Sequence, residues 1–562
     1  MNDSLLEIRD LVLQNNRTGK VIISGISLSL KKGRVTGIVG ESGSGKSITA
    51  LAILGLLPAP LKIRSGTILL SGTSEPGAID LISPGTQKNA RGKKITMIFQ
   101  EPMTSLNPSM LCGKQLDESL KYHSKLNRRE RKKKILEWLS NVKLADPQAV
   151  YNSYPHQLSG GQRQRVMIAM ALAPGPELLI ADEPTTALDV TVQKEIIQLL
   201  KELQVEFDLT VMFITHDLRI LSEIAQDIIV MRKGEIIEYG KVQNILHNAH
   251  EPYTKALLAC QPDLNSRPEK LLTVQDFENG NIRQYPDRKK VISEVPVLTI
   301  NNLDLHYQSA LWGRNKPHHA LKNISLQVFK GETLGLVGES GCGKTSLGKT
   351  ILGLIRSASG DILYHEVNLQ KLTKQQRRKL SKNIQVVFQD PYSSLNPLFK
   401  VRTMLLEARK IHFPSEIREK SIHFIENLVE KIGLGKEALD KYPHEFSGGQ
   451  RQRIGIARAL AVEPEFLILD EAVSALDVSV QAQILNLLNV LKTEFELSYL
   501  FISHDLAVVR YMSDRVVVMK DGEIIESGDP DELYRDPQTD FTKKLISAIP
   551  GNTSYQNSSG SS

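Results

Sequence analysis

The chain has 562 residues, of which 41% are hydrophobic and 24% charged, and its formal net charge at pH 7 is +7. This is the composition of an ordinary globular protein, long enough for several domains. The charge is small for the length. It suits a protein that works near phosphates or anionic lipid, but many soluble proteins carry as much.

The amino terminus and the cysteines argue against several classes of protein. The first residues, "MNDSLLEIRD", contain two early acids and no long apolar core, so they do not form a signal peptide. The longest apolar stretch, "ITALAILGLLPAP" (48–60), is too short to cross a bilayer and ends in prolines. Cys112, Cys260 and Cys342 form no CxxC pair, which argues against a disulfide framework, a zinc site or an iron–sulfur cluster and suits a reducing cytosol.

One long segment occurs twice. The string "GIVGESGSGKS" from Gly37 returns as "GLVGESGCGKT" from Gly335, and "LSGGQRQR" from Leu158 returns as "FSGGQRQR" from Phe446. Four further strings repeat in the same order with nearly the same offset, which is a domain length and not the period of a solenoid. The sequence therefore predicts one domain that has been duplicated.

The spacing of the repeats sets the expected boundaries. We expect a first domain over 1–262 and a second over 297–550. The polar segment 263–296, which has prolines and few aromatics, predicts a tether between them. The tail 551–562 has the composition of a disordered segment.

Each copy holds a glycine-rich loop between a strand and a helix. In the first, "RVTGIVG" predicts a buried strand, "SITALAILGLL" predicts a helix, and "GESGSGKS" between them fits the pattern G-x-x-x-x-G-K-[ST]. Backbone N–H groups of such a loop cradle phosphate oxygens, and the helix adds its positive N-terminal dipole. Lys46 can reach the β- and γ-phosphates, and the Ser47 hydroxyl can ligate Mg²⁺.

The alternative reading is a glycine turn with an incidental lysine. It would have to occur twice in the same setting, although the pattern arises by chance at only about 10⁻⁵ per position. The candidate ATP-binding residues of the two loops are Gly40, Glu41, Ser42, Gly43, Ser44, Gly45, Lys46 and Ser47, and Gly338, Glu339, Ser340, Gly341, Cys342, Gly343, Lys344 and Thr345.

Two acidic residues end a second apolar run in each copy. The string "ELLIADE" (177–183) is typical of a central parallel strand that delivers carboxylates at its carboxyl-terminal edge. Asp182 would hold Mg²⁺ through water, and Glu183 would polarise the water that attacks the γ-phosphate. In the second copy Asp470 and Glu471 take these roles. The alternative for such an acid is a helix cap.

Glutamine and histidine end two more short strands in each copy. Gln100 and Gln389 end "ITMIFQ" and "IQVVFQ", where each could touch the metal or the attacking water. His216 and His504 follow "TVMFIT" and "SYLFIS", and at this sheet edge either could hydrogen-bond the γ-phosphate, although a lone histidine is more often structural.

These strings, in this order, resemble the nucleotide-binding domain of the ATP-binding cassette superfamily. The resemblance covers Leu6–Pro262 and Val297–Pro550, and the SGGQ string is specific to this superfamily among phosphate-loop proteins. It implies an α/β fold of two tandem P-loop NTPase domains. Each would have a RecA-like mixed sheet core, an antiparallel β subdomain and a helical subdomain that carries the signature.

The resemblance also implies that two domains bind two ATP molecules head to tail, so that the chain is an intramolecular pseudo-dimer. ATP closes this clamp, and hydrolysis opens it. Asp189 in "TALD" and Asp477 in "SALD" would cross-link the two sites. The signature residues expected to contact the ATP of the opposite domain are Ser159, Gly160, Gly161 and Gln162, and Ser447, Gly448, Gly449 and Gln450.

Further strings indicate one branch of this superfamily. "P-x-[ST]-S-L-N-P" after each glutamine, "HEPYTKALLACQP" (250–262) and "DPQTDFTKKLISAIP" (536–550) resemble the ATPases of oligopeptide, dipeptide and nickel importers. The resemblance implies an ATPase that uses ATP and Mg²⁺ and works with two transmembrane permease subunits and an extracytoplasmic substrate-binding protein. It would be peripheral on the cytoplasmic face of the inner (plasma) membrane and bind no nucleic acid. Peptide is the expected cargo, with nickel or a metal chelate as alternatives.

A soluble twin-cassette ATPase that acts on ribosomes or DNA is the alternative class. A twin-cassette ATPase that acts on ribosomes would need a long, charged, helical linker, and one that acts in DNA repair carries zinc CxxC modules. The segment 263–296 is short, contains prolines and has no helical periodicity, and the chain has no CxxC pair.

The family's helical subdomain is expected at Glu101–Tyr154 and at Asp390–Tyr442, where its groove receives a cytoplasmic helix of the permease. We expect Leu106 and Leu395 to order this groove; ordinary core packing is the alternative. The string "NRRERKKK" (127–134) predicts a solvated helix face or, alternatively, contact with lipid headgroups.

In this family an aromatic residue after the first strand stacks on adenine. In the second copy "LDLHY" places Tyr307 there, whereas the first copy reads "LVLQN", with Asn15 at the aligned position. Because asparagine has no extended π-face, we expect the two adenines to be held unequally.

Overall fold

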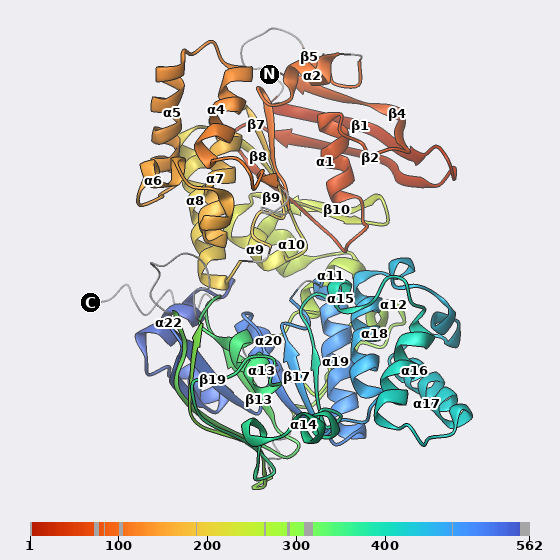
Figure 1. Ribbon diagram of the computed structural model, residues 1–562. Helices are drawn as coiled ribbons and strands as arrows, with labels where there is room; N and C mark the ends of the chain where they lie inside the picture. Colours follow the sequence, from red (N-terminus) through yellow and green to blue (C-terminus); the bar gives the residue numbers. More distant parts are fainter. Residues whose placement is uncertain are drawn as a thin grey trace. The chain divides into compact units, whose positions relative to one another are not determined.

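The structure is a computed structural model that describes residues 3–71, 78–83, 85–100, 105–186, 188–263, 266–288, 293–307, 318–474 and 476–550. Contacts between residues divide the chain into two units (Figure 1). The first comprises Met1–Leu188 and Val192–Leu258, and the second comprises Asp189–Thr191 and Ala259–Ser562. The predicted disordered tail, 551–562, lies outside the described residues.

A six-stranded mixed sheet forms the centre of the first unit, in the order β10-β9-β3-β8-β7-β6. All neighbours are parallel except β9 and β10. Every residue of β3, β7 and β8 is buried, which is the pattern of strands covered on both faces. The strands are β3 (Val35–Val39), β6 (Ile95–Ile98), β7 (Leu178–Asp182), β8 (Thr210–Thr215), β9 (Asp227–Arg232) and β10 (Glu235–Lys241).

An antiparallel sheet packs against this core. Its order is β2-β1-β4-β5, and the strands are β1 (Ser4–Asn15), β2 (Val21–Lys31), β4 (Leu61–Ser71) and β5 (Ala78–Asp80). Alternate residues of β2 are buried, as expected of a sheet with one face on a core. Its inward residues Ile26 and Leu30 join the same apolar cluster as Leu178 and Ile180 of β7.

The helices of the first unit include a separate subdomain between β6 and β7. There α4 (Cys112–His123), α5 (Arg128–Asn141) and α6 (Pro147–Tyr151) pack with one another and with α7 (Gly160–Leu172). The remaining helices begun in the first half of the chain are α1 (Lys46–Leu54), α2 (Thr86–Ala90), α8 (Val190–Glu206), α9 (Leu218–Ile224), α10 (Val242–Asn248), α11 (Pro252–Ala259) and α12 (Val274–Glu278).

The second unit repeats this architecture. Its sheets have the orders β12-β11-β14-β15 and β16-β17-β18-β13-β19-β20, the same arrangement strand for strand. The strands are β11 (Pro296–Tyr307), β12 (His318–Phe329), β13 (Thr333–Val337), β14 (Ser359–Tyr364), β15 (Val367–Asn368), β16 (Ile384–Val387), β17 (Phe466–Asp470), β18 (Ser498–Ile502), β19 (Arg515–Lys520) and β20 (Glu523–Gly528). The helices are α13 (Lys344–Ile351), α14 (Lys374–Leu380), α15 (Pro391–Ser394), α16 (Val401–His412), α17 (Arg418–Lys431), α18 (Gly448–Leu460), α19 (Val478–Glu494), α20 (Leu506–Met512), α21 (Pro530–Arg535) and α22 (Asp540–Ser547).

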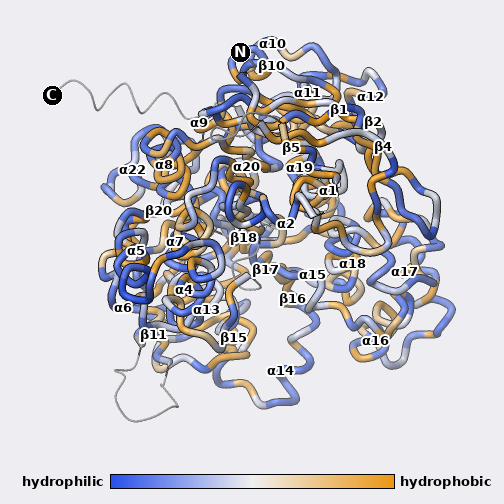
Figure 2. The backbone as a smooth tube through the Cα atoms, turned by 90° about the horizontal axis from the view of Figure 1, so that it is seen from above, coloured by the Kyte–Doolittle hydropathy of each residue, from blue (hydrophilic) through white to orange (hydrophobic). Residues whose placement is uncertain are grey.

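The predicted fold class is confirmed in both units: a mixed α/β core, an antiparallel β subdomain and a helical subdomain. Hydrophobic residues gather along the strands of the cores, whereas loops and helix faces carry hydrophilic ones (Figure 2). Within the described ranges, no helix has the length and apolar character needed to cross a membrane.

The segment predicted as a tether makes specific contacts within the second unit. The backbone N–H of Leu271 donates to Asn486 Oδ1 (2.9 Å), and Asn486 Nδ2 donates back to the Leu271 carbonyl (2.8 Å). The Arg267 guanidinium donates to the carbonyl of Ser513 and pairs with Asp531 at 3.5 Å. The described part of this segment, 266–288, is therefore held to α19 and to the region of α20 and α21 by polar contacts of its backbone and its side chains.

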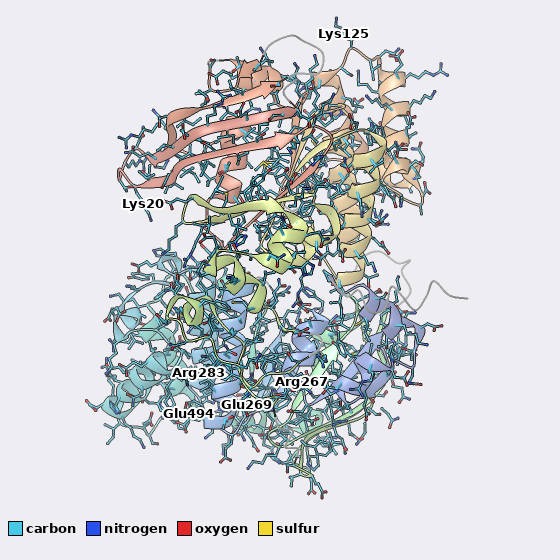
Figure 3. All side chains as sticks on the ribbon, turned by 180° about the vertical axis from the view of Figure 1, so that it is seen from behind. Lys20, Lys125, Arg267, Glu269, Arg283 and Glu494 are labelled. Atoms are coloured by element: carbon cyan, nitrogen blue, oxygen red, sulfur yellow. The ribbon has the colours of Figure 1, made fainter. Side chains whose placement is uncertain are left out.

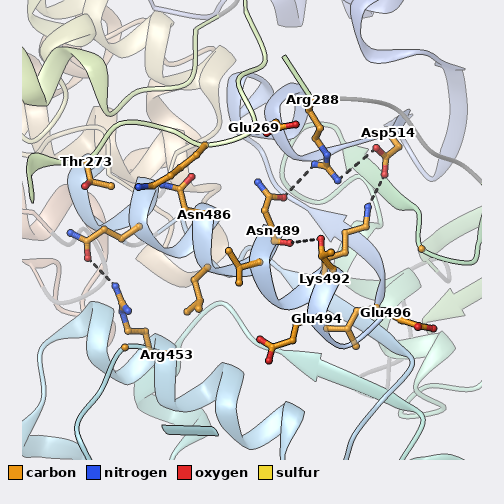
Figure 4. Close-up of a pocket in the computed structure, with 18 of the residues that line it drawn as sticks. Glu269, Thr273, Arg288, Arg453, Asn486, Asn489, Lys492, Glu494, Glu496 and Asp514 are labelled. Carbon is orange, nitrogen blue, oxygen red and sulfur yellow. Dashed lines mark hydrogen bonds and ion pairs between the residues drawn. The ribbon is translucent and has the colours of Figure 1, made fainter. Parts of the chain in front are cut away.

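Arg288 is the most connected of these side chains (Figure 4). Its guanidinium donates to the carbonyl of Met512 (3.0 Å) and to Asn489 Oδ1 (3.3 Å), and lies 3.7 Å from the carboxylate of Asp514. The same carboxylate accepts a hydrogen bond from Lys492 at 2.8 Å. The segment and α19 also line a pocket of 1480 Å³. Arg288 thus ties the segment to the residues that follow α20.

Replacing Arg288 by alanine tests whether these contacts hold the segment in solution. We expect Arg288→Ala to reduce the local stability of this region by about 1–3 kcal/mol, because it leaves a buried carboxylate with one cation fewer. Hydrogen–deuterium exchange of the amides of 266–288 and of α20 would show faster exchange. The matched control is Arg283→Ala, an exposed arginine of the same segment (Figure 3). Equal exchange in both variants and the unsubstituted chain would mean that the segment is a free tether.

Candidate functional site

The glycine-rich loop of the first unit lies between β3 and α1, as its sequence predicts. Gly45 precedes the helix with φ at 105°, and a Cβ added there would lie 2.4 Å from Ile23 Cδ1. Only glycine meets both conditions without strain. The loop therefore enters the helix tightly, and the first backbone N–H groups of α1 are directed towards the space that the loop encloses.

The lysine of each loop is held by backbone oxygens. Lys46 Nζ donates to the carbonyls of Gly40 (2.7 Å) and Glu41 (2.9 Å), and the side chain is only 5% exposed. Lys344 makes the same two bonds in the second unit, at 2.7 and 2.9 Å. A buried ammonium fixed at this point supplies a positive charge inside the loop, where an anionic phosphate would be stabilised.

A hydroxyl and a carboxylate meet beside each lysine. Ser47 Oγ donates to Asp182 Oδ1 at 3.0 Å, and Thr345 Oγ1 donates to Asp470 Oδ1 at 3.1 Å. Burial raises the pKa of Asp182 to about 6, against the opposing effect of the Ser47 hydroxyl, and burial likewise raises the pKa of Asp470. Hydroxyl and carboxylate oxygens are the ligand types that Mg²⁺ prefers, so this donor pair fits that ion.

Three side chains converge on one oxygen of Glu183. Oε2 accepts hydrogen bonds from Thr186 Oγ1 (2.9 Å) and Gln100 Nε2 (3.1 Å), and His216 Nδ1 lies 3.3 Å away. Burial alone would raise the pKa of Glu183, but the hydrogen bond and charge of His216, with the Thr186 hydroxyl, outweigh it and lower the pKa to about 2. The carboxylate is therefore ionised at neutral pH and can accept a hydrogen bond from water.

The second unit repeats this cluster around Glu471. Gln389 Nε2 donates to its Oε2 at 2.6 Å, and His504 Nδ1 lies 3.4 Å from Oε1. Burial opposes ionisation here too, yet the bond and charge of His504 lower the pKa of Glu471. The pKa of His504 is raised in return, because the carboxylate outweighs the effect of burial. Ser474 occupies the position of Thr186, but its hydroxyl donates to the backbone carbonyl of Glu471 at 3.0 Å.

The structure thus brings together, within each unit, the predicted lysine, hydroxyl, aspartate, glutamate, glutamine and histidine. Parallel neighbouring strands explain this, because β6, β7 and β8 end at the same edge of the sheet, as do β16, β17 and β18. Such a set can bind a nucleoside triphosphate and place a water molecule against its terminal phosphate.

The signature strings begin helices, also as predicted. Ser159 caps α7: its Oγ accepts from the backbone N–H of Gln162 (3.3 Å), whose side chain accepts from the N–H of Ser159 (3.0 Å). Ser447 and Gln450 form the same capping box at α18, at 3.4 and 3.1 Å. A Cβ on Gly161 would lie 2.7 Å from Val192 Cγ1. Each signature therefore presents an exposed helix N-terminus, which attracts anions.

The two aspartates expected to cross-link the sites are Asp189 and Asp477. Asp189 groups with the second unit, where its carboxylate accepts a hydrogen bond from the backbone N–H of Ser340 at 2.9 Å. Asp477 takes the N-cap position of α19. The phosphate loop of Lys344 thus has an acidic neighbour at its Ser340.

The ends of the first strands align as the sequence predicts. β1 and β11 each contain 12 residues, and their last residues are Asn15 and Tyr307. The Asn15 side chain accepts hydrogen bonds from the backbone N–H groups of Arg17 (2.9 Å) and Thr18 (3.2 Å). Tyr307 is 38% exposed, and its hydroxyl lies 3.0 Å from Ser346 Oγ, just after the phosphate loop. Only the second unit presents an aromatic ring here.

One contact of the first phosphate loop was not predicted from the sequence. The Tyr253 hydroxyl of α11 accepts a hydrogen bond from the backbone N–H of Glu41 (3.1 Å), and Arg232 stacks over its ring at 4.6 Å. The equivalent residue of α22 is Phe541, which has no hydroxyl. The only signal was the tyrosine of "HEPYTK" against the phenylalanine of "TDFTKK".

Leu106 and Leu395 are both only 2% exposed, so they are packed in the core and can order the groove only from beneath its surface. A pocket of 520 Å³ does lie nearby in the first unit, lined by Leu56, Met97, Phe99, Gln115 and Glu118 among others. Phe99, 42% exposed, offers the apolar surface that the leucines do not. The residues 101–104 of the predicted string lie outside the described ranges.

Comparison with known proteins gives matches over most of the chain. The family described as "ABC transporter" matches residues 23–186 and again 321–474, and the family described as "Oligopeptide/dipeptide transporter, C-terminal region" matches 237–287. Curated relatives are glutathione import ATP-binding proteins, GsiA. That of Salmonella choleraesuis is 44% identical over 94% of this chain and 86% of its own length, and that of Salmonella paratyphi A is 43% identical over 97% and 89%.

Solved structures match a single cassette. One is cbiO1 from Clostridium perfringens, described as part of the ABC transporter complex cbiONQ. It is 29% identical and covers 43% of this chain and 92% of its own, with a TM-score of 0.38.

The unequal strand ends predict unequal ATP affinity. We expect the site of Lys344 to bind ATP more tightly than the site of Lys46, because stacking of adenine on Tyr307 contributes roughly 1–3 kcal/mol, or about five- to a hundredfold. Titration with nucleotide would measure each site in a chain whose other loop lysine is replaced by alanine. Tyr307→Ala should weaken the tighter site, and Asn15→Tyr should strengthen the weaker one. Equal affinities, with no effect of Tyr307→Ala, would contradict the stacking.

Proposed function

This chain belongs to the ABC transporter family and is one of its ATP-hydrolysing subunits, and on that premise we propose that it powers the uptake of short peptides through two permease subunits. The observation that carries the proposal is the cluster on Glu183 and Glu471, which has its glutamine and its histidine in both units. A carboxylate held ionised at a sheet edge, beside a lysine-bearing phosphate loop, is suited to hydrolysis of the terminal phosphate bond.

In the proposed reaction each residue has a distinct task. The loop N–H groups and Lys46 bind the β- and γ-phosphates. Glu183 accepts a hydrogen bond from the attacking water and polarises it, while Gln100 and His216 fix the carboxylate and contact the water or the γ-phosphate. The second unit assigns the same tasks to Lys344, Glu471, Gln389 and His504.

We further propose that Mg²⁺ accompanies ATP at each site. Ser47 with Asp182, and Thr345 with Asp470, would hold the ion together with phosphate oxygens and water. When bound, the ion neutralises charge between the phosphates. Among the described residues there is no cluster of three or more histidine, cysteine or acidic side chains, which suits an ion that takes its other ligands from the nucleotide.

We also propose that each signature helix contacts the ATP bound by the other unit's phosphate loop. The support is local: each of the two helices presents a capped, exposed N-terminus with glycine in its first turn, where a γ-phosphate can approach the backbone. Binding of two nucleotides would then draw the two units together, and hydrolysis would release them.

Substitution of each glutamate tests the catalytic assignment. Glu183→Gln and Glu471→Gln keep the size and hydrogen-bonding shape of the side chain but remove the charge that polarises water. We expect the substituted site to lose about 10²–10⁴-fold of its rate, the range of a lost general base. Because an ATP that is not hydrolysed at one site would keep the proposed clamp closed, each single variant should lose at least about tenfold of the steady-state ATPase rate, with ATP affinity little changed. A variant that kept full activity would remove its glutamate from the catalytic role.

The relatives support a proposal for the cargo and the partners. The C-terminal region match and the glutathione-importing relatives support a peptide of a few residues, delivered by an extracytoplasmic binding protein, with the chain peripheral at the cytoplasmic face of the inner membrane. Nickel or a metal chelate remains the alternative cargo within this branch. Uptake of labelled di- and tripeptides and of nickel by cells with and without the chain would distinguish them.

The pocket of 520 Å³ is the proposed permease contact of the first unit. It opens between the end of β6 and α4, and Phe99 and Leu56 offer exposed apolar surface. A short amphipathic permease helix laid into it would bury these side chains.

An acidic substitution in this pocket should uncouple transport. We expect Phe99→Asp to leave ATP affinity within about twofold but to abolish peptide uptake, because an unpaired charge in a buried contact opposes docking of the permease. Val205→Asp, at a position 73% exposed on α8, is the matched control and should transport normally. Loss of ATP binding in purified Phe99→Asp, or normal uptake, would show that the pocket is not the docking site.

A further inference from the structure

We propose that the turn between α4 and α5, with the adjoining side of α5, is a docking surface for anionic lipid headgroups. We call it the basic surface and define it by its exposed cations, Lys121, Lys125, Arg128, Arg129, Lys132 and Lys133. Lys125 marks the turn (Figure 3), and α5 is among the most hydrophilic helices of the chain (Figure 2).

The six cations are not neutralised by acidic neighbours. Within the described ranges no carboxylate forms an ion pair with any of them, and Lys132 lies over the Tyr151 ring at 5.4 Å. The one arginine of this stretch that is paired is Arg131, which binds Asp117 at 2.7 Å and is not part of the surface. The positive charge of the surface is therefore available to a partner.

The scaffold beneath the charges is fixed. Asn127 and Glu130 close a capping box at the start of α5, and Arg131 also donates to the Leu126 carbonyl at 2.9 Å, which holds the turn. Ile135 and Leu139 anchor the helix in the core. Arg128 and Lys132, like Arg129 and Lys133, are four residues apart and lie along one side of the helix. The surface is thus preformed and need not order on binding.

An exposed aromatic residue lies among the cations. Tyr122 is 86% exposed, between Lys121 and the turn, at the end of α4. Tyrosine with lysine or arginine beside it is typical of the membrane–water interface, where the ring enters the headgroup layer. Duplex nucleic acid or an acidic protein would account for the charge, but a phosphate backbone or a carboxylate does not by itself favour an exposed ring beside the turn.

The duplicated unit provides an internal comparison. Over α4–α5 (112–141) the chain has nine Lys or Arg and four Asp or Glu, a net charge of +5. Over α16–α17 (401–431) it has six and five, a net charge of +1. Several cations of the second pair are neutralised in ion pairs, such as Arg402 with Asp440 and Arg409 with Glu416. The excess positive charge is therefore a property of the first unit and not of the fold that the two units share.

The basic surface adjoins the pocket proposed for the permease. Glu118 and Ser119 of α4 line that pocket together with Gly92, and a Cβ on Gly92 would lie 2.3 Å from His123 Nε2 at the end of the same helix. A permease helix in the pocket would bring the cytoplasmic leaflet close to the turn. This placement rests on the proposed function, whereas binding to lipid alone does not require a permease.

Vesicle binding of the full chain tests the proposal without a permease. The purified protein is floated with vesicles of phosphatidylcholine alone and of phosphatidylcholine with phosphatidylglycerol, at about 0.05 M and about 0.5 M salt. One variant combines Arg128→Gln, Arg129→Gln and Lys133→Gln. The matched control combines Lys410→Gln, Arg418→Gln and Lys420→Gln, three exposed cations of α16–α17. A third variant, Tyr122→Ala, leaves the charge unchanged.

We expect binding only to the anionic vesicles, lost at high salt. Each cation near an anionic surface increases affinity about fivefold, so the triple variant should bind on the order of a hundredfold more weakly and the control within about twofold. Tyr122→Ala should weaken binding severalfold, with melting temperature and ATPase rate unchanged in every variant. Equal binding to neutral vesicles, equal loss in both triple variants, or retention of duplex DNA under salt that abolishes vesicle binding would overturn the proposal. If Phe99→Asp failed to uncouple transport while vesicle binding held, only the permease assignment would fall.

Discussion

A half-buried, ionised carboxylate at the end of a central strand is the constraint on which each candidate site depends. Glu183 follows β7 with a positive φ of 46°, and Glu471 follows β17 with φ at 49°. Burial opposes the charge of each and would raise the pKa, but the hydrogen bond and charge of the histidine from a neighbouring strand end outweigh it, and the glutamine from the other neighbouring strand end donates a further hydrogen bond. Because those partners come from adjacent parallel strands, the sheet order itself determines the chemistry at this edge.

Duplication has kept this centre and let its surroundings diverge. The lysine and hydroxyl contacts differ by no more than 0.1 Å between the units. Around this centre, Asn15 and Tyr253 of the first unit correspond to Tyr307 and Phe541 of the second. The helix pair α4–α5 of the first unit is strongly basic, whereas the pair α16–α17 of the second is nearly neutral. A fused pair can diverge in this way because each copy mutates independently.

The sequence predicted the fold and the centre of the site because their signals are local. A phosphate loop needs consecutive glycines and a lysine, and a buried strand with an acid at its end can be recognised within seven residues. Contacts between distant polar residues leave no such pattern. Nothing in the sequence around Arg288 indicates that this arginine binds Asn489 and the residues after α20. The sequence alone therefore predicted a tether for the segment 263–296. Leu106 is a similar case, since a leucine in a loop motif fits a groove and a core equally well.

The central claim is that both sites of one chain hydrolyse ATP and work as a pair. The most direct test is the number of ATP molecules retained by the chain that carries Glu183→Gln and Glu471→Gln together, after incubation with labelled ATP and rapid removal of free nucleotide. If each loop binds and each glutamate is the hydrolytic residue, two ATP and no ADP should be retained per chain. Retention of a single ATP, or of ADP, would show that one site does not bind or hydrolyses by another group, and would contradict the account.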